Sequence, residues 1–350
     1  MRNNFLILFL VFCFNASAQT AQSWVKSYTG FIGKTAFTMH LHKAANDYDA
    51  YVYYMNTQQP YHLTGQNQKS STITLMGAPV DSEQQEKWVL NITGKKVTGS
   101  FIVNKKSTPL TAAERNFEPA ATYVYVTKKE KLFPNAKSSP EANFYQSGIW
   151  YNNNSFVNNI LWPNIKGTAT VGNYFLENRN NFIAAVKEEH KDLKQADYQD
   201  ASFMYNRDMT GRLLMTYVSQ HLLVFSADSY EFSGGAHGNF GTGHYVIDMR
   251  NQKLLTLQDI ISDTLALQGL LEKNFRRIYK VPADQSLIEY GLFTNTIAPN
   301  DNFFLTQKCL GFTFNPYEIG PYAAGQIIIY IPIKEFSHLL TDYAKGIFND

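Results

Sequence analysis

The chain has 350 residues, with 31 Lys and Arg against 29 Asp and Glu, and a formal net charge of +2. This balance argues against a nucleic-acid-binding surface, which would need clustered basic residues rather than the scattered pairs Lys95-Lys96, Lys105-Lys106 and Lys128-Lys129. Only 2 cysteines are present, whereas 25 Phe and 22 Tyr predict stabilisation by burial and by cross-strand aromatic pairing.

Residues 1–18 are predicted to be a cleavable secretory signal peptide. Arg2 precedes the apolar run Phe5–Phe14, and Ala16-Ser17-Ala18 has the small-x-small pattern of a cleavage site. We expect cleavage near Ala18 and an exported protein that works in the periplasm or outside the cell.

No transmembrane anchor is expected in the mature chain. The apolar run is shorter than the roughly 18 residues that a membrane span needs, and no later segment supplies one. A lipid anchor on Cys13 is the alternative, but the bulky Phe12 disfavours it. Cleavage removes Arg2 and no acidic residue, so the net charge falls from +2 to +1 and Cys309 is the one cysteine left.

Residues 19–127 are predicted to form a β-rich domain. Short alternating segments are separated by turn residues, which predicts an antiparallel meander, curled or closed like a barrel. No helical period interrupts it. The expected strands are Thr35–His42, Asp49–Met55, Ser71–Met76, Lys87–Thr93 and Val97–Val103.

Residues 128–143 are charged and contain Pro134 and Pro140. This composition predicts a linker or an exposed crossover.

The rest of the chain mixes helices and strands. One helix is expected to start near Asn178 and run through Glu189, a second to follow an Asp263 or Thr264 cap, and a third to begin at Lys334. Met204-Tyr205 and Leu213–Val218 are interpreted as a hairpin around a turn at 208–211. Further strands are expected at His221–Ser226, Tyr245–Asp248 and Gln326–Ile331. This irregular insertion of helices predicts an α+β fold of mixed sheets with a few helices.

Four stretches together are distinctive, namely Phe232–Asn239, Tyr245–Asp248, Lys253–Ile261 and Phe312–Gly325. They resemble a known family, the RsiV-like extracellular domain, which is a domain of unknown function shared by the anti-sigma factor RsiV. Upstream, Leu161–Ile165 and Asn180–Ile183 are similar to a PdaC-like small domain. The resemblance implies a PdaC-like α+β domain at 144–240 and an RsiV-like C-terminal α+β domain at 241–350.

The resemblance implies a recognition module of the cell envelope, with peptidoglycan or a lysozyme-like protein as partner. An anti-sigma role is not implied, because the chain has neither a cytoplasmic sigma-binding segment nor a transmembrane helix.

The loop Gly234-Gly235-Ala236-His237-Gly238-Asn239 is a candidate ligand site. Its glycines permit positive φ, which can aim backbone amides and the His237 imidazole at a ligand. We name Gly234, Gly235, His237 and Asn239 as its binding residues. The alternative is a tight turn in which His237 bonds a backbone carbonyl.

A second candidate is the loop around Asn315-Pro316-Tyr317-Glu318, with Tyr322. Two tyrosines and a carboxylate on a stiff loop suit a sugar ring or a protein partner. The alternative is a corner at which the tyrosines complete the core.

No metal, cofactor or strong catalytic site is predicted. His40 and His42 lie on one face of a strand, but no third ligand is spaced nearby, so an exposed strand face is the preferred interpretation. Cys309 is interpreted as a buried, inert cysteine in a strand. The motifs GxSxG and HExxH are absent.

Three functions therefore stay open. The leading hypothesis is an exported, non-catalytic envelope protein that binds peptidoglycan-type glycan or a lysozyme-like protein. The second is a glycan-directed hydrolase or deacetylase that uses His237 with a carboxylate such as Glu318. The third is a structural or scaffolding protein of the envelope.

Overall fold

The structure of the protein is a computed structural model. It describes residues 23–67, 72–116, 120–165 and 170–348. The expected signal peptide at 1–18, with Cys13, lies outside the described residues.

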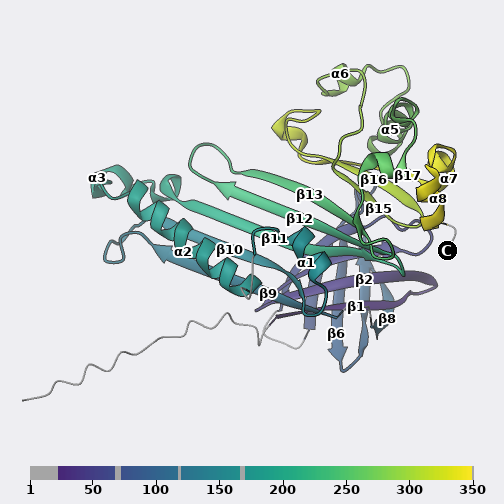
Figure 1. Cartoon of the computed structure of the whole chain (residues 1–350). Helices are drawn as coiled ribbons and strands as arrows, with labels where there is room; N and C mark the ends of the chain where they lie inside the picture. The colour runs from purple at the N-terminus through teal and green to yellow at the C-terminus, as the bar shows by residue number, and fades with distance from the viewer. Residues whose placement is uncertain (1–22, 68–71, 117–119, 166–169, 349–350) are drawn as a thin grey trace, which may run out of the picture.

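The first part of the chain forms a closed antiparallel barrel of eight strands (Figure 1). Each strand pairs with the next, and β1 closes the barrel by pairing with β8. The barrel-like domain expected from the alternating pattern is confirmed. Its strands are β1 Ser23–Ile32, β2 Thr35–Ala44, β3 Asp47–Tyr54, β4 Tyr61–Asn67, β5 Thr72–Gly77, β6 Glu86–Thr93, β7 Lys96–Val103 and β8 Lys106–Arg115.

Strand β2 is buried on both of its faces. Met39 and Leu41 point into the barrel, where they pack in the same core as Trp88. His40 and His42 face outward but are also buried, because the next sheet covers this side of the barrel. The exposed strand face expected for these histidines is therefore wrong.

The second layer is a six-stranded sheet that extends away from the barrel (Figure 1). Its order is β14-β13-β12-β11-β10-β9, and the β10–β11 pair alone among these is parallel. A parallel pair needs a crossover, and here it contains α1 Ser155–Leu161, α2 Val171–Glu189, α3 Gln195–Tyr198 and the 3₁₀ turn η2 Ser202–Tyr205. The strands are β9 Ala121–Lys131, β10 Glu141–Tyr151, β11 Arg207–Val218, β12 Leu222–Phe232, β13 Asn239–Asp248 and β14 Lys253–Leu254.

The six-stranded sheet and its crossover change four expectations. Residues 128–143 end β9 and begin β10, so they form a hairpin and not a linker. The residues expected to turn at 208–211 lie inside the continuous strand β11. Helix α2 begins at Val171 rather than near Asn178, because Thr170 caps it by accepting from the backbone N–H of Asn173. The sheet also runs through the boundary placed at 240/241, which falls inside β13.

The C-terminal part combines short helices with a three-stranded antiparallel sheet, β15-β16-β17. Of the two caps predicted, Asp263 or Thr264, the helix has Asp263, whose carboxylate accepts from the N–H groups of Leu265 and Ala266. The helix expected from Lys334 is instead divided into α7, η4 and α8. The elements are α4 Leu257–Ile260, α5 Thr264–Tyr279, α6 Leu287–Tyr290, β15 Phe303–Leu305, β16 Cys309–Phe314, η3 Tyr322–Ala324, β17 Ile327–Pro332, α7 Ile333–Phe336, η4 Ser337–Leu339 and α8 Asp342–Phe348.

The expected α+β class is confirmed, with a barrel followed by mixed sheets and few helices. The C-terminal core joins the two preceding layers, since Tyr53 of the barrel and Tyr217 of β11 belong to the same buried cluster as Phe275 of α5. Within the described ranges, no helix has the length and apolar character needed to cross a membrane.

Candidate functional site

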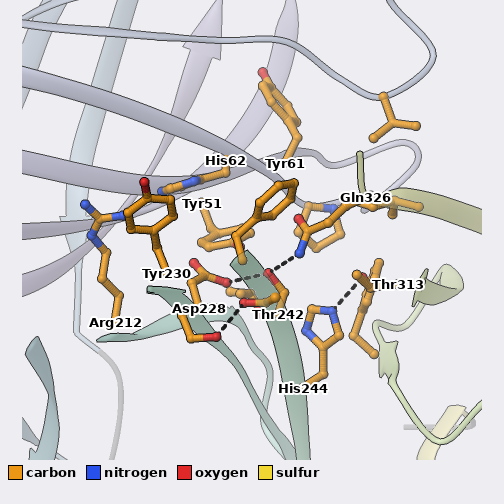
Figure 2. Close-up of a pocket in the computed structure, with 18 of the residues that line it drawn as sticks. Tyr51, Tyr61, His62, Arg212, Asp228, Tyr230, Thr242, His244, Thr313 and Gln326 are labelled. Atoms are coloured by element: carbon orange, nitrogen blue, oxygen red, sulfur yellow. Dashed lines mark hydrogen bonds between the residues drawn. The ribbon is translucent and has the colours of Figure 1, made fainter. Parts of the chain in front are cut away.

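A cavity of about 380 Å³ lies where the barrel, the six-stranded sheet and the three-stranded sheet meet. Figure 2 shows side chains from all three parts turned toward it. Its walls carry six aromatic side chains, which are Tyr51, Tyr61, Tyr230, Phe240, Phe304 and Tyr330. Polar groups interrupt this aromatic lining, chiefly Arg212, Asp228, Thr242 and Gln326.

The strand register sets these side chains in rows. Arg212 of β11 is the cross-strand partner of Asp228 of β12, which in turn is opposite Thr242 of β13. Two residues further along each of these strands, Tyr230 of β12 is opposite Phe240 of β13. Because residues two apart share a face, the polar row and the aromatic row both line the same cavity.

Asp228 is anchored through one of its carboxylate oxygens. Its Oδ1 accepts hydrogen bonds from Ser226 Oγ at 2.5 Å and from Thr242 Oγ1 at 2.9 Å. Tyr51 of the barrel donates to Ser226 Oγ at 3.0 Å, and Gln326 Nε2 donates to Thr242 Oγ1 at 2.8 Å. The network therefore fixes one polar wall of the cavity with contributions from all three structural parts.

A second cluster of polar side chains connects the barrel with the six-stranded sheet. His62 Nε2 lies 3.0 Å from Asp49 Oδ1, and Arg212 Nε lies 3.6 Å from Asp49 Oδ2. Burial on its own would raise the pKa of Asp49, but the hydrogen bond and charge of His62 and the charge of Arg212 outweigh it and lower that pKa. Asp49 is therefore an ionised carboxylate at neutral pH.

His244 of β13 makes a polar contact with the three-stranded sheet. Its Nε2 lies 2.8 Å from Thr313 Oγ1, and its ring packs on Phe304 with centroids 4.8 Å apart. Burial lowers the pKa of His244 to about 4, so the ring is neutral at physiological pH.

The two loops predicted as ligand sites meet each other. The rings of His237 and Tyr322 stack with centroids 3.8 Å apart, and Tyr322 donates its hydroxyl hydrogen to Gly238 O at 2.6 Å. Gly234 and Gly235 both have positive φ, as expected for a sharply turning loop. We call the exposed surface formed by His237, Tyr317 and Tyr322 the aromatic ledge.

The aromatic ledge lies beside the cavity and does not line it. Phe240 links the two, because it lines the cavity and packs edge-on against Tyr322 at 5.6 Å. His237 Nδ1 lies 3.1 Å from Gly238 O, which is the kind of backbone contact expected of a tight turn.

The hydrogen-bond partners of Glu318 are asparagine side chains and not His237. Its carboxylate accepts from Asn300 Nδ2 at 3.0 Å and from Asn315 Nδ2 at 3.2 Å, and it lines a shallow depression next to the cavity. Asn239 is exposed at the start of β13.

The remaining candidates are structural. His42 Nε2 accepts from the backbone N–H of Met215, and His40 Nδ1 lies 2.7 Å from Ser27 Oγ. Among the described residues, no group of three His, Cys, Asp or Glu could hold a metal ion. Cys309 is buried, and burial raises the pKa of its thiol to about 12, in line with an inert cysteine.

The sequence interpretation missed the cavity itself. Arg212, Asp228 and Tyr51 were not identified, although the alternation Ser226-x-Asp228-x-Tyr230 was visible in the sequence. Alternation shows that such residues share a face, but an exposed face and a cavity wall give the same pattern.

Comparisons with known proteins identify part of the chain. A family described as a protein of unknown function, DUF3298, matches residues 257–334. No curated protein matches. These findings lend no support to the RsiV-like and PdaC-like names.

Two solved structures match about two thirds of the chain. A DUF3298 family member from Bacteroides fragilis is 22% identical, with a TM-score of 0.56, and the match covers 66% of this chain and 96% of that one. A DUF3298 family protein from Pseudomonas aeruginosa is 15% identical, with a TM-score of 0.45, and the match covers 65% of this chain and 97% of that one. The residues that the DUF3298 family model matches, 257–334, contribute Phe304, Thr313, Gln326, Ile328 and Tyr330 to the cavity.

Proposed function

We propose that this chain is an exported, non-catalytic envelope protein that binds a glycan of the peptidoglycan type in the cavity between the barrel and the two sheets. The RsiV-like and PdaC-like resemblance belongs to this proposal, as does export by the segment 1–18. The composition of the cavity walls is the observation that carries it.

A sugar ring has an apolar C–H face and a rim of hydroxyl and amide groups. The aromatic faces of Tyr51, Tyr230 and Phe240 can pack on the C–H face, while Asp228 and Gln326 can hydrogen-bond the rim. A volume of about 380 Å³ also falls within the range of small-molecule sites, which is roughly 300–1,000 Å³.

The cavity is held rigid before any ligand arrives. The bonds from Tyr51 to Ser226 and from Gln326 to Thr242 fix side chains from all three parts of the fold. Such preorganisation favours binding because little side-chain entropy is lost when the ligand enters.

Recognition of a lysozyme-like protein is the second candidate, and the aromatic ledge favours it. Tyr317 is 57% exposed there and lies beside the His237–Tyr322 stack. Exposed tyrosines on a supported loop are typical of protein-binding surfaces.

Isothermal titration calorimetry with soluble peptidoglycan fragments and with lysozyme separates these candidates. We expect fragments to bind the wild type, and Tyr230→Ala in the cavity to weaken their binding at least tenfold. Tyr317→Ala on the ledge is the matched control and should leave fragment binding unchanged. Fragment binding that survives Tyr230→Ala but disappears in Tyr317→Ala would move the site to the ledge, and no heat with any fragment would refute the proposal.

Incubation of the same fragments with the wild type tests for hydrolysis or deacetylation. We expect the fragments to be recovered intact. Products that form with the wild type and fail to form with a folded His237→Ala variant would instead support the enzymatic alternative.

A further inference from the structure

Arg212 leaves its hydrogen-bonding capacity unused at the cavity wall. Its guanidinium lies over the ring of Tyr145, 5.4 Å from the centroid, and makes no hydrogen bond to any described residue. The Nε atom is buried without a partner. The side chain as a whole is 36% exposed, so the terminal N–H groups of the guanidinium remain open to a ligand in the cavity.

The nearest carboxylate does not satisfy Arg212. Asp49 Oδ2 is 3.6 Å from Arg212 Nε, which exceeds hydrogen-bonding distance, and the other oxygen of Asp49 is bonded to His62. Asp49 therefore offsets part of the charge of Arg212 but leaves its N–H groups available.

Asp228 offers the complementary half of a site. Both of its hydrogen bonds to described residues use Oδ1, from Ser226 and Thr242. The second oxygen, Oδ2, is left as an acceptor in the cavity wall, on the strand next to Arg212. The site thus presents an unused planar donor group and an unused acceptor among aromatic rings, and Figure 2 shows Arg212 and Asp228 along the same side of the cavity.

We infer that the glycan bound here is acidic: a carboxylate on its sugar accepts hydrogen bonds from the Arg212 guanidinium while a sugar hydroxyl donates to Asp228 Oδ2. This inference rests on the proposed function and names its ligand class. A planar guanidinium matches a carboxylate in a two-bond, charge-assisted geometry. A doubly charged phosphate fits less well, because the carboxylates of Asp49 and Asp228 lie beside the same guanidinium and would repel it.

Hexuronic acids and N-acetylmuramic acid are two kinds of sugar that carry such a carboxylate. In a hexuronic acid it is attached to the ring, and in an N-acetylmuramic acid unit it belongs to a lactyl ether. Both present the same planar anion next to ring hydroxyls, so separate probes are needed to tell them apart.

Calorimetry of the full chain with three probes tests the inference. The probes are the disaccharide of N-acetylglucosamine and N-acetylmuramic acid, a short oligogalacturonate, and neutral N,N′-diacetylchitobiose. We expect one acidic probe to bind at least tenfold more tightly than chitobiose. Arg212→Gln should remove this preference, so that the acidic probe binds no more tightly than chitobiose, while Arg212→Lys, which keeps the charge but loses the planar group, should restore part of it.

The matched control is Arg179→Gln, which removes an arginine from α2, outside the cavity lining. It should bind all probes like the wild type. Should Arg212→Gln fail to fold, the wild type can be titrated with the methyl ester of the preferred acidic probe, which is expected to bind as weakly as chitobiose.

The outcomes separate the two proposals. Equal affinity for acidic and neutral probes, or an ester that binds as well as the acid, would overturn the acidic ligand and leave glycan binding in place. Absence of binding to all three probes would overturn both.

Discussion

The Nε2 atom of His42, on the barrel, lies 3.0 Å from the backbone nitrogen of Met215, on the six-stranded sheet. Strand β10 pairs with β11 only as far as Arg212, so the edge of β11 beyond that point lacks a neighbouring strand. The imidazole of His42 accepts the N–H that the sheet leaves unpaired there. This contact fixes the barrel against the sheet beside the cavity that both of them line.

Replacing His42 with leucine should destabilise the protein. The substitution leaves the buried N–H of Met215 without an acceptor, which costs roughly 1–3 kcal/mol. Urea unfolding followed by circular dichroism measures the loss, with the exposed His338→Leu as the control, which should stay within about 0.5 kcal/mol of the wild type. A His42→Leu variant as stable as the control would mean that the contact contributes nothing.

Stability should decrease as the pH falls below neutral. Burial lowers the pKa of His42 to about 4, that of His244 to about 4 and that of His40 to about 3. Their pKa in the unfolded chain is about 6.5, so between that pH and the folded values the unfolded state binds more protons and the free energy of unfolding drops. Each buried histidine contributes a slope approaching about 1 kcal/mol per pH unit in this window.

The free energy of unfolding measured at pH 7, 6 and 5 checks this dependence. Carboxylates with ordinary pKa values remain largely ionised in that range and contribute little to the slope. A His40→Gln variant should show a shallower decrease than the wild type. A free energy that stays constant from pH 7 to pH 5 would rule out neutral, buried histidines.

Gly311 should not tolerate a side chain. It is the cross-strand partner of Phe304, and a Cβ atom built on Gly311 would lie 2.0 Å from the Phe304 ring. Because Phe304 lines the cavity and packs on His244, Gly311→Ala should lower the stability by about 1–3 kcal/mol and weaken ligand binding.

Gly243→Ala is the matched control, since a Cβ atom there would meet nothing within 4 Å. It should change the thermal unfolding midpoint little. Equal midpoints for the Gly311→Ala and Gly243→Ala variants would show that the Phe304 ring moves aside at no cost.

Local patterns in the sequence were sufficient to predict much of the fold. Alternation and turn residues identified the strands of the barrel, and the Asp263 cap located the start of α5. The C-terminal helix was less predictable, because the apolar spacing of Phe336, Leu339 and Leu340 continues through a break in the helix. The spacing of apolar residues indicates which residues face the core. A 3₁₀ turn between two short helices gives nearly the same apolar spacing as one continuous helix, so the spacing does not reveal the break.

The cavity is formed by contacts between residues far apart in the sequence, which no local sequence pattern predicts. His40 and His42 share a strand face, as predicted, but they are buried because the six-stranded sheet docks on that face, with β11 bonded to His42 and Tyr123 of β9 packed against its ring. Tyr51 and Ser226 are 175 residues apart and meet through one hydrogen bond. The sequence therefore indicated the unusual loops, which meet at the aromatic ledge, and missed the neighbouring cavity assembled from three parts of the chain.

The most direct test of this account is a crystal structure of the protein soaked with whichever acidic probe binds more tightly, the disaccharide of N-acetylglucosamine and N-acetylmuramic acid or the oligogalacturonate. We predict electron density for a sugar ring in the cavity between Tyr51 and Tyr230, with its carboxylate within hydrogen-bonding distance of the Arg212 guanidinium. Density for the sugar on the aromatic ledge, with the cavity empty, would contradict the account.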